Sequence, residues 1–346
     1  MSKKLIAKDQ LFHIAKQIQR QVFGTRKTQV YLFEKFQLSE QYTPEKLWDL
    51  YEDSVLTELE AYSPYKRSIM RYSFSGHESF HCKSLWLKKG YDFICNKKHF
   101  ADTDSVVELG VGKNMVSAIR YWLKAFSLTK EDTLTDLAEY IFSTNTGRDP
   151  FCEDIATLWV LHYNLVKSQV ASIYQLVFID FQRERREFDK VQLLSFIKRK
   201  CSVPEQKNVY NENTVSKDIN VFLHSYIEPN DLKQLERYSA LLINLGLMRE
   251  IEKGVYRFQE IDTDSIPDVV ILYALCDIKG EDKLLSFDKI QELSLLFCIP
   301  IASFLDKVRH IAEVYSDYIT YSDNSGIRNI YFKDNIESIH LLDMYY

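Results

Sequence analysis

The sequence has no long apolar run, no secretory leader and no paired cysteine framework. No segment approaches the roughly 20 consecutive apolar residues that a membrane helix needs. The first residues, MSKKLIAKDQLFHIAKQIQRQ, have a polar, helix-like rhythm without a signal-peptide core. The six cysteines contain no C-x-x-C pair, so we expect reduced thiols. These absences predict a soluble, cytoplasmic protein with no membrane segment.

A nucleotide-binding loop is also missing. The run Gly110-Val-Gly-Lys113 looks like the end of a phosphate-binding loop. That motif requires glycine at position 107 and Ser or Thr at position 114, where this chain has Val107 and Asn114. A G-x-G-x-x-G motif fails as well, because Met115 stands at its last glycine. We therefore expect no nucleotide cofactor.

The size and charge of the chain predict several domains with different partners. A chain of 346 residues with 46% hydrophobic content is long enough for two or three folded cores. The net charge of −5 argues against indiscriminate coating of nucleic acid. Residues 83–130 hold nine Lys/Arg against four Asp/Glu (+5), whereas residues 277–346 hold seven against twelve (−5). This asymmetry favours local DNA docking with a partner elsewhere, and ordinary surface charge is an equally open interpretation.

The stretch from Asp104 to Leu128 predicts a helix-turn-helix. A first apolar helix breaks at Gly110-Val-Gly112, and a second helix follows. Apolar residues of the second helix recur with the spacing of one buried helical face, namely Met115, Val116, Ile119, Trp122, Leu123 and Phe126. The opposite face carries side chains that bond phosphates and base edges, namely Lys113, Asn114, Ser117, Arg120 and Tyr121. We interpret this face as the DNA-binding element.

Two further units repeat this pattern. A helix opening at Glu212 is predicted to bury Val215, Ile219, Phe222, Leu223 and Tyr226. Its polar face suits DNA and carries Asn213, Ser216, Lys217 and Asn220. A helix at 241–247 and a strand pair turning at Lys253-Gly254 complete the order of a winged helix. Residues 286–333 predict a third such unit, and its acidic charge makes it the weakest DNA candidate.

The predicted fold class is mainly α with small β wings, built from tandem winged-helix or helix-turn-helix units. We expect an N-terminal helical extension over 1–67 and a first helix-turn-helix domain over 68–182. Winged-helix-like units follow over 183–262 and 263–346. Within these units the patterns predict helices over 83–95, 129–142, 152–166, 171–181 and 189–200. They also predict that Leu85, Trp86 and Phe93 point inward, and that Arg71–Phe74 is compatible with a short strand.

One cluster of polar residues could carry chemistry. His77-Glu78-Ser79-Phe80-His81 matches H-E-x-x-H, but a zinc protease needs this motif on a helix, and Ser75-Gly76 directly precedes it. We therefore favour structural roles in which His77 and Glu78 cap the following helix and tie it to the core. For DNA cleavage, the candidate catalytic residues are His77, Glu78, Asp149, Glu153 and Asp154. The alternative for Asp149, Glu153 and Asp154 is a structural role at a helix N-terminus, and the metal ligands stay unknown.

Five blocks in order resemble the bacterial uncharacterised-domain family number four thousand and seven. They are FSGHESF (74–80), VELGVGKNMVSAIRYW (107–122), DPFCEDIATLWVLHY (149–163), NTVSKDINVFL (213–223) and PDVVILYALCD (267–277). The resemblance runs from about Arg71 to Phe332. The family motif Ser-Gly-His-Glu-Ser/Thr-Phe falls on Ser75–Phe80. The family commonly has proline at the next position, where this chain has His81, so the second His of H-E-x-x-H is incidental.

The resemblance implies a place in DNA phosphorothioation and phage defence. It implies a DNA-binding component that nicks one strand for sulfur insertion. DNA cleavage usually needs a metal ion, and for such a reaction we expect Mg²⁺ or Mn²⁺. The alternative is a non-catalytic adaptor or regulator that recruits sulfur-transfer or ATPase partners. The implied partners are double-stranded DNA and the sulfur-transfer and ATPase proteins of the same system. A homodimer is an open arrangement, because winged-helix proteins are often dimers.

Overall fold

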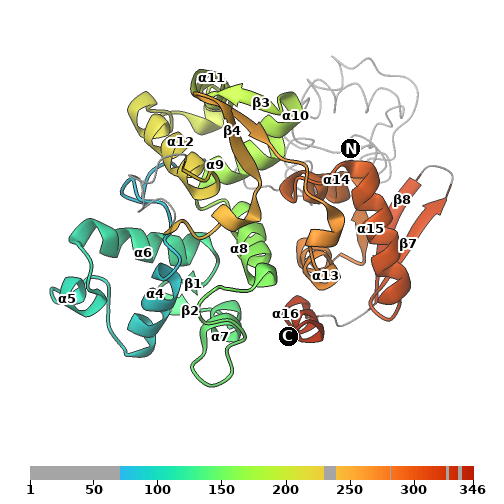
Figure 1. The fold of residues 1–346 in the computed structure, drawn as a ribbon, viewed down its shortest axis with the longest axis horizontal. Coiled ribbons are helices and arrows are strands. Elements are labelled where there is room, and N and C mark those ends of the chain that lie inside the picture. The colour runs from blue at the N-terminus through green and yellow to red at the C-terminus, as the bar shows by residue number, and fades with distance from the viewer. Residues whose placement is uncertain (1–70, 230–238, 281, 325–326, 334–336) are drawn as a thin grey trace, which may run out of the picture. The chain divides into compact units, whose positions relative to one another are not determined.

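The computed structural model describes residues 71–346 except 230–238, 281, 325–326 and 334–336. The contacts divide the chain after Met70, and the second unit, Arg71–Tyr346, is described here (Figure 1). The helices predicted for residues 1–67 lie outside the described residues. Within the described part of the chain, every helix is too short or too polar to cross a membrane.

The first elements of the second unit include the predicted helix pair. They are α4 (Trp86–Cys95), α5 (Ser105–Leu109), α6 (Lys113–Ala125), β1 (Thr129–Lys130), β2 (Thr133–Leu134) and α7 (Asp136–Phe142). The helix predicted over 129–142 is wrong in its first half. There Glu131 and Asp132 adopt positive φ and turn β1 onto β2. The helix ends are otherwise close to the predicted ones.

A buried helical layer follows. It consists of α8 (Ile155–Ser168), α9 (Ser172–Gln175), the π-helix η1 (Leu176–Phe181) and α10 (Gln182–Glu184). All residues of α8 from Ala156 to Val166 are buried. The structure confirms the strongly buried helical character predicted for 171–181, although a π-helix forms its second half.

The next segment folds as strand, helix, helix, strand, strand. It contains β3 (Glu187–Asp189), α11 (Lys190–Lys200), η2 (Pro204–Gln206), α12 (Glu212–Tyr226), η4 (Ile243–Leu245), β4 (Met248–Glu252) and β5 (Val255–Phe258). The sheet order is β3-β5-β4, and all pairs are antiparallel. A capping box at Asp189 starts α11. The strand pair predicted to turn at Lys253-Gly254 is confirmed, whereas the helix predicted over 241–247 is only the turn η4.

The last segment repeats the same order of elements. It contains η5 (Thr263–Ser265), α13 (Asp268–Ile278), β6 (Leu284–Ser286), α14 (Phe287–Leu296), α15 (Ile301–Val314), β7 (Ile319–Asn324), β8 (Ile327–Phe332), α16 (Ser338–Leu341) and η6 (Leu342–Met344). Its sheet order is β6-β8-β7. The mainly helical class with small antiparallel sheets is confirmed. The assignment of these segments to winged-helix units stays a prediction.

One continuous hydrophobic core runs through this unit. It joins residues from Cys82 to Leu342 and includes Trp122, Trp159 and Phe222. The boundaries predicted at 182 and 262 stay predictions, since buried side chains from all three segments belong to this core. Two local expectations were wrong. Leu85 is 51% exposed because it precedes the first turn of α4, and Arg71–Phe74 forms no strand.

Candidate nucleic-acid interface and the Ser75–Phe80 loop

Helix α6 has the two faces that its sequence predicts. Gly110 ends α5 in the left-handed conformation with φ 64°, and Gly112 precedes α6 in an extended one. The inner face of α6 is buried and includes Val116, Ile119 and Trp122. Its outer face is exposed and carries Lys113, Asn114, Ser117 and Arg120. Four polar side chains therefore face solvent along the first three turns of α6.

Two of the five residues predicted to face DNA have protein partners. Arg120 donates from Nε to Asp132 Oδ1 at 2.9 Å, and this hydrogen bond raises the pKa of Arg120 and lowers that of Asp132. Tyr121 is half-buried, and its hydroxyl reaches Val170 O at 3.5 Å. Its ring lies edge-on to His77. The expectation of a solvent-facing Tyr121 is wrong, because the loop before α4 covers its ring.

The predicted inner face of helix α12 is confirmed, and its exposed outer face is smaller than predicted. The predicted inward residues are all buried, namely Val215, Ile219, Phe222, Leu223 and Tyr226. Asn213 and Lys217 are exposed, and Ser216 is half-buried. Asn220 accepts a hydrogen bond from Lys190 Nζ at 2.6 Å. The face of α12 that remains in solvent therefore lies near its N-terminus.

Buried side chains anchor the extended segment that precedes α4. The Tyr72 amide donates to Gln206 Oε1 at 2.8 Å, and the Ser73 amide donates to Ser172 Oγ at 2.8 Å. The Trp122 indole donates to Phe80 O at 3.1 Å. These anchors come from distant parts of the sequence. They hold the backbone of the Ser-Gly-His-Glu-Ser-Phe motif in one conformation.

The motif itself is a tight loop with an unusual backbone. Four of its residues have positive φ: Ser75 (76°), Gly76 (100°), Glu78 (49°) and Ser79 (65°). Non-glycine residues in this region are strained, and such strain persists only where surrounding contacts determine the conformation. No helix runs through His77–His81. The H-E-x-x-H match therefore lacks the helical geometry that a zinc protease requires.

His77 is buried under this loop and is 2% exposed. Its Nδ1 accepts a hydrogen bond from the Ser79 amide at 3.1 Å, which leaves the ring proton on Nε2. Nε2 lies 3.1 Å from Asp218 Oδ1, although the N–H direction is not aligned for a hydrogen bond. The ring stacks on Trp122 with centroids 6.0 Å apart. The expectation that His77 caps α4 is wrong, because Leu85 stands at that position without a side-chain cap.

Asp218 is the carboxylate that holds the loop, and the sequence reasoning missed it. It is 2% exposed, and the Ser75 amide lies 3.0 Å from each of its oxygens. A signal was present in the sequence. Position 218 falls three residues after Val215 and one before Ile219, on the apolar stripe of the predicted helix. An aspartate on a buried stripe needs a partner inside the protein.

The carboxylates predicted around position 150 act as caps. Asp149 is 8% exposed and accepts from the amides of Glu153 (3.0 Å) and Asp154 (2.9 Å). Asp154 is the N-cap of α8 and accepts from the Ala156 amide at 2.7 Å. The alternative structural interpretation is confirmed for Asp149 and Asp154. Glu153 is exposed, and the catalytic role of the group stays a prediction.

These residues do not form a metal centre with His77 and Glu78. Across residues 71–346, outside the gaps named above, no group of three or more His, Cys, Asp or Glu side chains is arranged to hold a metal ion. Glu78 is exposed on the loop, whereas His77 is buried beneath it. Among the described residues, the candidates therefore do not converge on a single metal centre.

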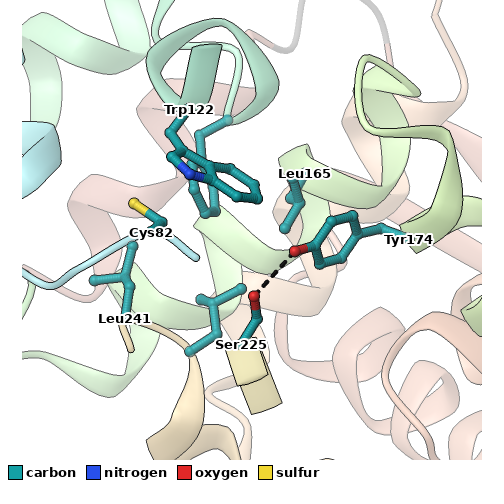
Figure 2. A pocket seen from close by; sticks show the side chains of 8 residues that line it. Cys82, Trp122, Leu165, Tyr174, Ser225 and Leu241 are labelled. Carbon is teal, nitrogen blue, oxygen red and sulfur yellow. Dashed lines mark hydrogen bonds between the residues drawn. The ribbon is translucent and has the colours of Figure 1, made fainter. Parts of the chain in front are cut away.

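The core beneath the loop is tightly closed. Figure 2 shows Cys82, Trp122, Leu165 and Tyr174 converging on a gap between the helices, with Tyr174 hydrogen-bonded to Ser225 at 3.0 Å. Burial raises the pKa of the Cys82 thiol and of the Tyr174 hydroxyl. The gap has no room for a water molecule. It is a packing space and offers no ligand site.

Comparison with known proteins places the chain in a family. No curated protein matches it. Two crystal structures of SspB, one of them bound to a magnesium ion, match with 25% identity and a TM-score of 0.68. Each alignment covers 79% of this chain and 88% of the SspB chain. The profile of the family described as protein of unknown function (DUF4007) matches residues 74–346. The chain therefore belongs to the DUF4007 family, as its five sequence blocks predicted.

Proposed function

We propose that this protein is a DNA-binding component of a bacterial DNA phosphorothioation and anti-phage defence system. The observation that carries the proposal is the exposed polar face of α6, where Lys113, Asn114 and Ser117 stand in the first two turns of a helix that follows a tight turn. The similarity to SspB over 79% of the chain supports it. The family resemblance supplies the defence context.

The arrangement of elements supports a winged-helix mode of binding. The orders β3-α11-α12-β4-β5 and β6-α14-α15-β7-β8 both place two helices between the first and second strands of a small sheet. We assign DNA to the N-terminal part of α12, which belongs to the first of these orders, and to α6, which precedes both. We assign the sulfur-transfer and ATPase proteins of the same system to the acidic last unit, where like charge would repel DNA.

The direct test replaces the exposed polar residues of α6. Lys113→Ala should weaken binding several-fold and reduce the slope of log affinity against log salt by about 0.9, because one phosphate contact is lost. Fluorescence anisotropy with a labelled duplex at several salt concentrations measures both quantities. Lys333→Ala, at an exposed lysine of the acidic unit, is the matched control and should leave both unchanged. Equal affinity and equal salt dependence of the two variants would refute the assignment of DNA to α6.

A second candidate function is nicking of one DNA strand. Two observations favour it: Glu78 is displayed on a strained loop, and a similar SspB structure contains magnesium. Incubation with supercoiled plasmid and Mg²⁺ or Mn²⁺ should yield open circles, and Glu78→Gln should remove this product. Glu313→Gln, at an exposed carboxylate of α15, serves as the comparison variant and should keep this product. Binding without any open-circular product identifies a non-catalytic adaptor instead.

A further inference from the structure

The Ser75–Phe80 loop joins two helices that belong to different predicted units. On one side, Asp218 of α12 accepts the Ser75 amide with both oxygens and faces His77 Nε2 at 3.1 Å. On the other side, the His77 ring stacks on Trp122 of α6. In Figure 1 the segment that contains the loop, drawn in blue, runs between α6 and α12. The loop therefore sets how these helices lie relative to each other.

The loop also packs closely against α6. A Cβ atom on Gly76 would lie 2.6 Å from two ring carbons of Tyr121. The Trp122 indole holds Phe80 O from the same helix. Tyr121 and Trp122 follow directly after the exposed Arg120. A displacement of the loop would therefore reach the polar face of α6 through adjacent residues.

Burying the charge of Asp218 has an energetic cost that its contacts must offset. A buried carboxylate requires hydrogen bonds or opposite charge to compensate for lost hydration. Asp218 obtains them from the loop, whose backbone is strained at Ser75, Glu78 and Ser79. The carboxylate stabilises the strained conformation, and the loop in turn satisfies the carboxylate. The result displays Glu78 and Ser79 in solvent while His77 stays inside.

We propose that Asp218 is a positioning residue for DNA binding. It touches no DNA itself, since it is 2% exposed. It acts by fixing the loop, and through the loop it fixes α6 against α12 and keeps Glu78 and Ser79 exposed. This inference rests on the proposed DNA-binding function.

The test compares Asp218→Asn with Asp277→Asn in the full-length chain. Asp277 is the control, because it is a partly buried helical aspartate whose partners, the Tyr163 hydroxyl at 2.6 Å and Lys167 Nζ, belong to α8 and not to the loop. Asp218→Asn should speed amide hydrogen exchange of residues 75–80 about tenfold and weaken duplex binding by about tenfold, the size expected when a charge-assisted hydrogen bond is lost. Asp277→Asn should leave loop exchange and DNA affinity at the wild-type values.

Different outcomes separate the inference from the proposed function. Equal rates of amide hydrogen exchange for residues 75–80 in both variants would overturn the positioning role. Faster exchange of these residues in Asp218→Asn, combined with wild-type affinity for DNA, would overturn it as well. A wild-type protein that binds no duplex at low salt would instead overturn the proposed function. If Asp218→Asn does not fold, His77→Phe replaces it, because it keeps a ring against Trp122 and removes both the Nδ1 that accepts the Ser79 amide and the Nε2 that faces Asp218. The same tenfold changes are expected for that variant.

Discussion

Two buried histidines show how the same side chain serves different purposes in this fold. His162 lies in the centre of the core, where its ring contacts Tyr226 Oη at 2.8 Å and Leu296 O at 2.9 Å. His77 lies beneath an exposed loop and faces a carboxylate. In both, the partners place the ring proton on Nε2. His162 has neutral partners and links the helices that carry them. His77 faces the carboxylate of Asp218, which holds the strained loop.

The largest expected effect comes from removing the core histidine. His162→Ala leaves the Tyr226 hydroxyl and the Leu296 carbonyl without their partner and opens a cavity beside Phe178. We expect the free energy of unfolding to fall by about 4 kcal/mol. His77→Ala should cost about 2 kcal/mol, because the exposed loop above it can relax. Urea unfolding measures both, and a larger loss for His77→Ala would reverse the comparison.

The second prediction concerns pH. Burial lowers the pKa of His162 from 6.5 to about 4. Between these values the unfolded chain binds a proton that the folded chain does not, so stability falls as the pH drops from about 6.5 to 4. The loss contributed by this group is about 3 kcal/mol. Urea unfolding at pH 7 and 4.5 should show a steeper decline for the wild type than for His162→Gln. Equal declines would mean that the imidazole does not carry this dependence.

The third prediction concerns a substitution in the loop above His77. Gly76→Ala introduces a Cβ at φ 100° and 2.6 Å from the Tyr121 ring, so we expect a loss of about 2 kcal/mol. Gly110→Ala is the matched control. Gly110 also has positive φ (64°), but a Cβ there meets nothing within 4 Å, and the expected loss is about 1 kcal/mol. Thermal unfolding distinguishes them, and equal losses would show that the Tyr121 contact is unimportant.

The smallest expected effect on stability is that of Glu78→Gln. The side chain is exposed, and removing its charge changes no buried contact, so the change should stay within about 0.5 kcal/mol. Calorimetry of the purified variant tests this. A loss above 1 kcal/mol would mean that Glu78 supports the loop. In that case a lost nicking activity would no longer identify Glu78 as a functional residue.

Much of the local structure could be predicted because burial along a helix is periodic. The inner faces of α6 and α12 agree with the expectation from residue spacing, and the strand pair predicted to turn at Lys253-Gly254 is present. The failures were also local. Thr129–Leu134 forms a hairpin because Glu131 and Asp132 adopt positive φ, and periodicity carries no information on that conformation.

The sequence by itself determined which faces of α6 and α12 are apolar, where the glycine turn separates α5 from α6, and to which family the chain belongs. Only the tertiary structure decided that His77 is buried, that Asp218 holds the loop and that Tyr121 packs on Gly76. The physical reason is distance along the chain. Ser75 and Asp218 are separated by 143 positions, and a contact of this kind depends on how whole helices pack. No spacing rule within one helix contains it.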